Sequence, residues 1–347
     1  MLLLTSLIQG CYKEDAITPT VLTSAASKYE FPQGDSPADT IMAEVYEKYG
    51  VKCIYKDFTQ SDIDRSWLPP GGGGLVSTKC RWRYVNVDVQ LLSAATILKE
   101  KIFGLLPENM VQAALRSYPY LYVVDEMRYL SNGQLAKIYP TKALDSWTID
   151  LGLNYQQSDN YEMRIFYPVR VMVEVFDYAY AEGAITMPAE FFAGLDRYTL
   201  SLTSRNRANN AGPGTPDYTN YWARRGFLPF VSPVGGGVYT SPTQSGSALS
   251  ASVLSPLSDA DREIPQFFLF LCLDTHCWEY FEPGNIFDDC PKLKTRLEMF
   301  NNRMKEVYGI DFDAIRAKLY EGATLDTSPD RYRTESDDDD DYSFIYH

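Results

Sequence analysis

Histidine is the scarcest residue of this 347-residue chain, with two copies, His276 and His347. A site that needs two or three imidazoles side by side is therefore excluded unless both of them take part. His347 is the last residue and follows a run of aspartates, so we expect it to be disordered. His276 lies in Cys272-Leu-Asp-Thr-His-Cys-Trp278, and we expect it to pack near the end of a helix.

Positive charge is also in short supply, because 32 Lys and Arg face 46 Asp and Glu and leave a net charge of −14. That balance excludes the basic footprint of a nucleic-acid-binding protein. Much of the excess lies at the C-terminus, where Asp337 to Asp341 form an unbroken acidic run. Such a run repels itself and buries nothing, which predicts a disordered acidic tail over 325–347.

No Cys-x-x-Cys spacing occurs among the six cysteines, so a zinc site built from cysteine is not supported. Setting Cys11 aside leaves an odd number, which cannot pair completely. We predict mostly buried free thiols, with one disulfide left open, among these five residues: Cys53, Cys80, Cys272, Cys277 and Cys290.

The apolar run at the N-terminus, Leu2 to Ile8, is too short for a membrane span, which takes about 20 residues. It resembles the end of a secretory signal whose charged start is missing. Leu7-Ile8-Gln9-Gly10-Cys11 resembles a bacterial lipobox, which implies a signal peptide over 1–10 and a lipid on Cys11. Tyr12-Lys13-Glu14-Asp15 resembles the surface-export signal of Bacteroidetes lipoproteins. These resemblances imply a tether over 11–30 and an outer-membrane protein that faces the cell exterior; the alternatives are a chance cysteine and a plain leader.

Hydrophobic periodicity predicts an α+β domain over 31–324, with a mixed sheet in the N-terminal half and helices in the C-terminal half. In the sheet, Ser146–Leu153 alternates and predicts an edge strand with one buried face. The other predicted strands cover 51–58, 120–124 and a second strand that ends near Pro140; loops cover 68–75 and 232–262; and helices cover 87–106, 168–182, 187–201, 263–273, 292–308 and 313–320.

Several short segments, taken in order and spacing, resemble one family over about residues 35–320. This family comprises the zinc-binding metallopeptidase lipoproteins of Bacteroidetes, which are also called substrate import-associated zinc metallohydrolase lipoproteins. The resemblance implies a zincin-like fold and a role beside SusC/SusD-type, TonB-dependent importers of nutrients. The segments that carry it are Trp147-Thr-Ile-Asp-Leu-Gly-Leu153, Met187-Pro-Ala-Glu-Phe191, Ala223-Arg-Arg-Gly-Phe-Leu228, Val231-Ser-Pro233 and Lys305-Glu-Val-Tyr-Gly-Ile-Asp311, with Arg316 beyond.

The chain departs from this family at the metal site. The family's His-Glu-x-x-His motif, in which two histidines bind zinc and the glutamate polarises water, falls on Val173-Glu174-Val175-Phe176-Asp177. Val173 and Asp177 thus replace the two histidines, and Tyr180 replaces a further one. Glu174 keeps the position of the water-activating glutamate. The family's third ligand falls near Glu263.

Two carboxylates without imidazole suit zinc poorly. We therefore expect no catalytic residue and no metal: Glu174 is vestigial, Val173, Asp177 and Glu263 mark former ligand positions, and the only cofactor is a covalent lipid. The same alignment predicts that helix 168–182 turns Val173, Glu174 and Asp177 toward a cleft bounded by helix 263–273. The alternative is an altered site that still holds a metal.

Tyrosine is abundant, and tyrosine and tryptophan often form recognition surfaces for peptides and glycans. Tyr178, Tyr180, Tyr221 and Trp222 are the candidate binding aromatics; the alternative is that they pack in the core. The function hypothesis is a non-catalytic accessory subunit of a SusC/SusD-type importer, for substrate capture or assembly. An active zinc metallohydrolase with unusual ligands and a surface glycan-binding protein are the alternatives. The sequence does not identify the nutrient.

Overall fold

The computed structural model describes residues 28–63, 80–129, 141–142, 145–151, 165, 167–194, 223–224, 226–228, 264–285 and 287–321. The predictions of a signal peptide, a lipidated Cys11, a strand ending near Pro140, loops at 68–75 and 232–262 and an acidic tail lie outside these residues. Within them the protein is α+β, with a small mixed sheet in the N-terminal half and helices in the C-terminal half, as predicted.

The sheet is built around one long central strand, β3 (Tyr120–Tyr129). Parallel neighbours flank it, with Leu121 of β3 opposite both Cys53 and Trp147. The remaining pairings are antiparallel: β2 with β3 and β4 with β5. The other strands are β1 (Lys52–Ile54), β2 (Cys80–Tyr84), β4 (Thr141–Lys142) and β5 (Ser146–Asp150), in the order β1-β3-β5-β4 with β2 off this path.

The prediction of an edge strand at 146–153 is wrong. β5 lies between β3 and β4, and its first four residues are all buried. Ser146 and Thr148 give the sequence an apolar–polar alternation that is typical of a strand with one solvent-exposed face. Both are nevertheless almost completely inaccessible, at 0% and 1% exposure. The side chains of Ser146 and Thr148 are small enough to be buried on the second face of β5. Because they are polar, the sequence did not indicate that this face is buried.

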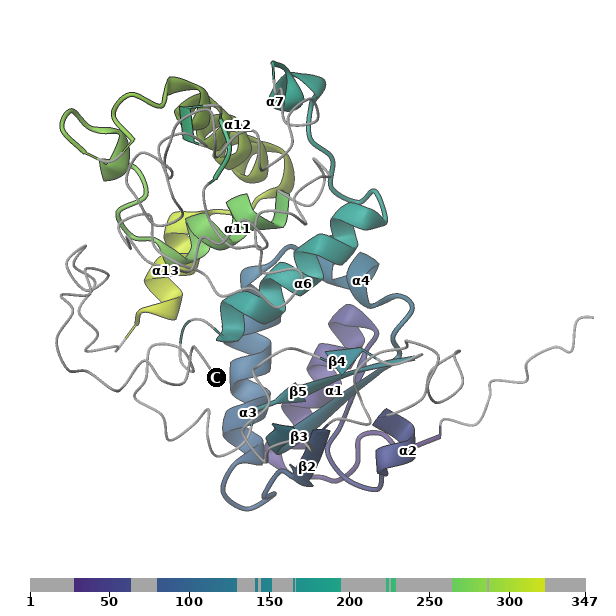
Figure 1. The fold of residues 1–347 in the computed structure, drawn as a ribbon. Coiled ribbons are helices and arrows are strands. Elements are labelled where there is room, and N and C mark those ends of the chain that lie inside the picture. Colours follow the sequence, from purple (N-terminus) through teal and green to yellow (C-terminus); the bar gives the residue numbers. More distant parts are fainter. Residues whose placement is uncertain are drawn as a thin grey trace, which may run out of the picture.

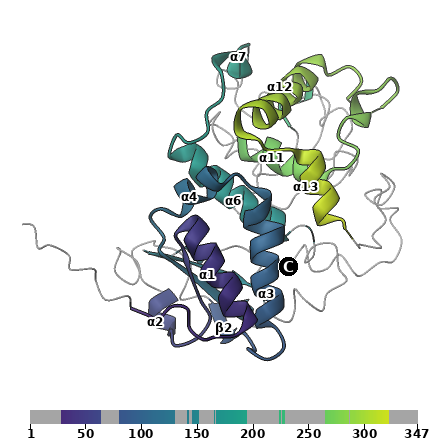
Figure 2. The ribbon, with the colours of Figure 1, turned by 180° about the vertical axis from the view of Figure 1, so that it is seen from behind.

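Helices α1 and α3 lie side by side on one face of this sheet (Figures 1 and 2), whereas Ile63 of α2 packs with Tyr122 and Val124 on the other face. The sequence predicted one helix over 87–106, but the segment changes geometry twice, from α-helix to a π-turn to a 3₁₀ turn. These elements are α1 (Pro37–Tyr49), α2 (Gln60–Ile63), α3 (Leu91–Ile97), the π-turn Leu98–Ile102, the 3₁₀ turn Phe103–Leu105 and α4 (Glu108–Leu115).

The C-terminal half is helical. Four predicted helices are confirmed with shifts of a residue or two at their ends, but the helix predicted over 187–201 is wrong. It ends at Phe192, because Ala193 is extended and Gly194 takes φ +69°, outside the helical region. The helices are α6 (Tyr167–Ala181), α7 (Ala189–Phe192), α11 (Ile264–Leu273), the 3₁₀ turn Glu279–Phe281, α12 (Pro291–Tyr308) and α13 (Phe312–Leu319).

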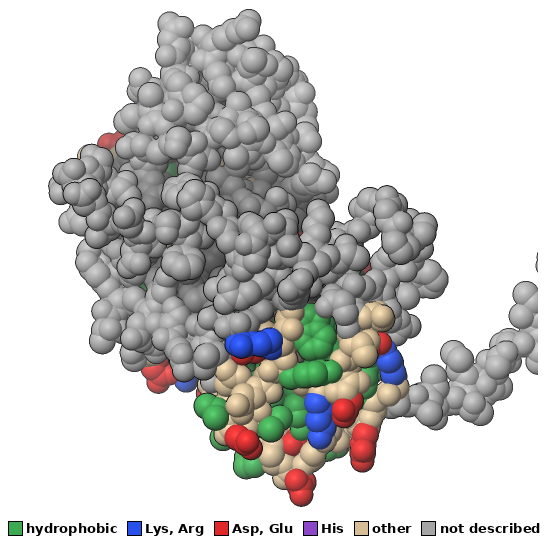
Figure 3. Space-filling view, turned by 60° about the horizontal axis from the view of Figure 1, so that its bottom comes forward, with side chains coloured by type: hydrophobic (Ala, Val, Ile, Leu, Met, Phe, Trp, Pro, Cys, Tyr) green, Lys and Arg blue, Asp and Glu red, His purple; other side chains and the backbone are tan. Residues whose placement is uncertain are grey.

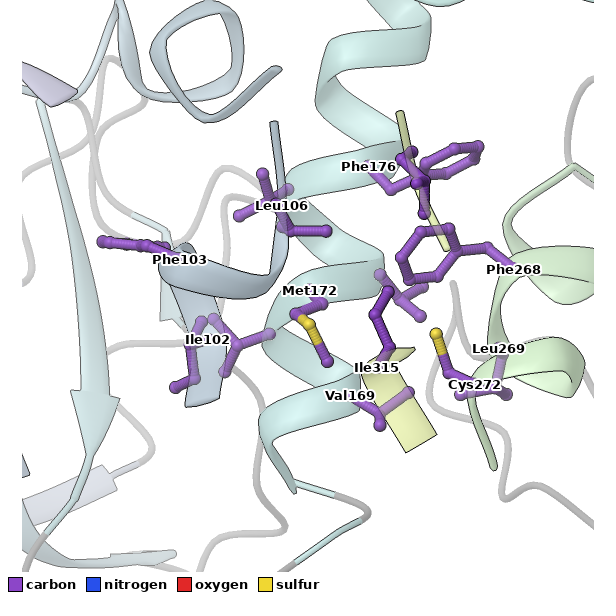
Figure 4. Packing of buried hydrophobic residues seen from close by; sticks show 14 of the residues in the cluster. Ile102, Phe103, Leu106, Val169, Met172, Phe176, Phe268, Leu269, Cys272 and Ile315 are labelled. Carbon is purple, nitrogen blue, oxygen red and sulfur yellow. The ribbon is translucent and has the colours of Figure 1, made fainter. Parts of the chain in front are cut away.

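One core runs through both halves, and α6 lies at its centre. α6 packs against α4 of the N-terminal half and against α11 of the C-terminal half (Figure 1). Figure 4 shows Val169, Met172 and Phe176 of α6 among side chains from both sides. Among the described residues no helix is both long and apolar enough to cross a bilayer.

The prediction of buried free thiols is confirmed at four positions: Cys53, Cys272, Cys277 and Cys290. All four have no exposed surface. The side chain of Cys80 lies outside the described part of the chain.

Candidate functional site

Helix α6 carries Val173 to Asp177, the segment predicted to correspond to a metal motif, and contacts hold both ends of the helix. At its start, the Asp150 N–H donates to the Tyr167 hydroxyl over 2.9 Å, which ties the helix to the end of β5. At its end, Gly183 takes φ +75° and its N–H donates to the Tyr180 carbonyl over 3.0 Å. Glycine tolerates this left-handed conformation, which terminates the helix.

Phe176 fixes the rotation of α6. Its ring centroid lies 4.5 Å from that of Phe268 on α11 and 6.0 Å from that of Phe300 on α12 (Figure 4). A helix turns about 100° per residue, so Glu174 points about 160° away from Phe176 and Asp177 about 100° away. The prediction that Glu174 turns toward helix 263–273 is therefore wrong, and the predicted approach of Asp177 to that helix stays a prediction. Apolar packing took that face, because an aromatic ring gains more from burial than a carboxylate does.

Val173 is completely buried, with 0% exposure, as part of the main core. Its isopropyl group has no lone pair to give to a metal. The residue therefore contributes to packing at the position where the family motif has its first histidine.

A charged stripe runs along a different face of α6, made of Arg170, Glu174 and Asp177. These residues are spaced i, i+4 and i+7, which places them on one side of a helix. Arg170 is 1% exposed, and the two carboxylates are half-buried. All three take part in polar interactions. Sequence reasoning missed Arg170, although an arginine inside the apolar run from Val169 to Val173 was the available signal.

Two tyrosine hydroxyls meet next to this stripe. The hydroxyl oxygens of Tyr118 and Tyr178 lie 2.7 Å apart, and the two rings pack edge to face with their centroids 5.5 Å apart. The buried Trp147 completes the group, with its ring 5.7 Å from each tyrosine ring. Burial raises the pKa of Tyr178, and the hydrogen bond to Tyr118 and the negative charges of Glu174 and Asp177 raise that pKa further. The Tyr178 hydroxyl therefore stays protonated at neutral pH.

The remaining candidates divide between packing and residues outside the described part. Tyr180 is half-buried and packs against the main core, as Tyr178 does. Tyr221, Trp222 and Glu263 lie outside the described residues, so the approach of Asp177 to Glu263 stays a prediction.

His276 does follow the end of α11, as predicted. Its backbone N–H donates to Asp274, and its Nδ1 lies 2.9 Å from Glu279 Oε1. These two partners of His276, Asp274 and Glu279, lie within three residues of it in the same turn.

The donor set on α6 does not fit a catalytic zinc ion. Such a site takes three protein ligands, usually with imidazole among them, and here α6 supplies a buried valine in place of the first. Within the described part of the chain, no three His, Cys, Asp or Glu side chains come close enough together to hold a metal. The arrangement offers instead an arginine and two carboxylates along one side of the helix, next to two tyrosine hydroxyls that are hydrogen-bonded to each other.

No protein-family model matches the chain, and no curated protein matches it. One solved structure does: a protein from Bacteroides caccae, provisionally named as a zinc-binding metallo-peptidase. It is 14% identical to this chain, with a TM-score of 0.43, over 85% of this chain and 97% of its own. A likeness this distant does not carry an argument about fold or activity.

Proposed function

We propose that this protein is a zincin-like relative of the metallopeptidase lipoproteins that has lost the zinc site and works by binding. The observation that carries the proposal is the complete burial of Val173 at the position of the first zinc ligand. Restoring a ligand there would place an imidazole in a packed apolar core. The motif helix therefore supports the fold rather than a reaction.

The charge pattern of α6 supports the same conclusion. A dication held between Glu174 and Asp177 would lie about one helical turn from the buried guanidinium of Arg170. Like charges this close repel strongly where water is scarce. Arg170 places a positive charge on the same side of the helix as the two carboxylates.

The cellular role that we propose is an accessory subunit of a SusC/SusD-type importer, held on the outer membrane by lipid at Cys11. Its support is the lipobox-like N-terminus together with the family resemblance. The half-buried polar side chains Glu174, Asp177 and Tyr178 are the part of α6 that we propose contacts a peptide-like or glycan-like ligand. A stacking platform for sugars has less support, since both Tyr178 and Tyr180 are half-buried against the core.

Zinc content separates this proposal from an active metallohydrolase. We expect protein purified without chelator to contain far less than one zinc per chain by elemental analysis. Glu174→Gln should leave the zinc content and any background peptidase activity unchanged. Glu182→Gln, at an exposed position just after α6, is the matched control. One zinc per chain, with an activity that Glu174→Gln abolishes and Glu182→Gln spares, would restore the enzyme reading.

The importer role has its own test. Solubilised outer membranes that contain the full chain should yield a SusC/SusD-type pair when the protein is captured. Cys11→Ala should move the protein to the soluble fraction and lose the pair. Retention of the variant in the membrane would contradict the lipid anchor.

A further inference from the structure

An exposed apolar patch lies at the sheet end of the molecule, on the connection between β2 and α3. It consists of Tyr84, Val87, Val89 and Leu92, which are 48%, 53%, 70% and 50% exposed. Figure 3 shows hydrophobic side chains across the described part of this end, with lysine, arginine and acidic side chains among them. Four exposed apolar side chains within residues 84–92 make this connection a candidate contact surface.

The turn that carries the patch is built to hold these side chains outward. The Asn86 side chain accepts the backbone N–H groups of Asp88 and Val89, at 3.0 and 3.3 Å. The Gln90 side chain accepts the Asn86 N–H over 2.8 Å, and Gln90 is itself buried. The valines are therefore displayed by a hydrogen-bonded turn and need no rearrangement before they contact a partner.

Tyr84 links the patch to the rest of this end. Its ring packs on Phe58 with centroids 5.1 Å apart, and its hydroxyl donates to the Phe58 carbonyl. Tyrosine with an apolar body and a bonded hydroxyl suits the boundary between water and lipid.

The chain enters the described structure at this same end. Lys28 pairs with Asp62 of α2, and Tyr29 packs on Tyr122, which in turn stacks on Phe58. Seventeen positions separate Lys28 from Cys11. In any conformation they span at most about 60 Å, so an anchor at Cys11 would hold Lys28 within that distance of the bilayer.

We infer that Tyr84, Val87, Val89 and Leu92 rest in the interfacial region of the lipid bilayer and orient the domain on it. The inference rests on the lipid at Cys11 proposed above, because that anchor would attach the membrane to the end of the described structure that carries the patch. Four side chains are enough to dip into a headgroup layer. They fall far short of the 20–30 residues per side that a stable contact with a second copy takes.

A fluorescent probe tests the inference without depending on natural lipidation. The full chain carries Cys11→Ser and an N-terminal histidine tag, and vesicles of phosphatidylethanolamine and phosphatidylglycerol with a nickel-chelating lipid hold it. An environment-sensitive fluorophore is attached at Val89→Cys. The matched control is Val307→Cys on α12, which is 58% exposed in the other half. The chain without an introduced cysteine gives the background labelling.

We expect the Val89 probe to shift its emission to shorter wavelength on the vesicles and to be quenched by spin-labelled lipid, while the Val307 probe changes in neither respect. Val87→Ser with Leu92→Ser should abolish the shift. Equal, water-like emission from both probes on tethered protein would overturn the inference. A shift that grows with protein concentration in the absence of vesicles would overturn it in favour of a second copy. Neither result bears on the zinc content or the importer.

Discussion

The two halves of the core satisfy their buried polar groups in different ways. In the N-terminal half the sheet does so mainly with backbone pairs, and β3 is hydrogen-bonded to strands on both sides, alongside neutral side-chain links from Gln33 and Tyr49. In the C-terminal half, arginine side chains reach carbonyls of neighbouring segments. Arg296 donates to the carbonyls of Phe191 and Gly226, and Arg316 donates to that of Leu271 at the end of α11.

The difference locates the weak points of the fold. A backbone ladder survives most single substitutions, because every residue type except proline carries the same N–H and C=O groups. A side-chain link is lost with one residue and leaves buried acceptors unsatisfied. The C-terminal half should therefore be the more sensitive to single changes, and the contact between α6 and α11 decides whether the halves behave as one unit.

The largest effect is expected at that contact. Phe268→Ala removes the ring that packs on Phe176 and Phe312, and should lower the free energy of unfolding by about 3–5 kcal/mol. Chemical denaturation followed by far-UV circular dichroism measures it. Val307→Ala, at an exposed position, should change it by less than about 0.5 kcal/mol. Equal losses would show that α11 does not hold the halves together.

Two arginines of α12, Arg296 and Arg303, should give losses of stability of intermediate size. Arg296 is 5% exposed and its guanidinium also lies over the rings of Phe191 and Phe267. Arg296→Met should lower the free energy of unfolding by about 2–4 kcal/mol, because two buried carbonyls lose a charged donor. Arg303 makes similar bonds to Thr186, but at an exposed site.

Arg303→Met should therefore lower the free energy of unfolding by no more than about 1 kcal/mol, because water replaces the lost donor. The same denaturation experiment compares the two variants. A loss at Arg303 as large as that at Arg296 would contradict the view that burial makes these links important.

The smallest effect at neutral pH concerns the thiols. Burial raises the pKa of Cys53, Cys277 and Cys290 from 9.0 to about 12. The unfolded chain loses these protons above pH 9 while the folded chain keeps them. Stability is therefore untouched by these groups below pH 9 and falls as the pH rises from 9 toward 12.

Alkylation under native conditions at pH 8 should accordingly leave all four described thiols unmodified, and denaturant should expose them. In subdenaturing urea, Cys272, Cys277 and Cys290 should react before Cys53 if the C-terminal half opens by itself. Mass spectrometry of labelled peptides measures the order. Simultaneous reaction would show that the two halves unfold together.

Local patterns predicted much of this architecture. The start of β3 at Tyr120, α6, α11, α12 and α13 were recognisable because their apolar spacing and their proline or glycine boundaries are properties of the local chain. The sequence likewise shows that no histidine lies between Val173 and Asp177, since this concerns which atoms are present and not where they lie.

Which face of α6 packs against which neighbour depends on contacts between distant segments of the chain. The sequence placed Glu174 toward helix α11, whereas packing gave that face to Phe176 and left the carboxylates in line with Arg170. It also buried both sides of β5 and brought the Tyr118 hydroxyl to Tyr178, sixty residues away in the chain. Periodicity defines the faces of a helix or a strand, but the partner of each face depends on how distant segments bury the most apolar surface together.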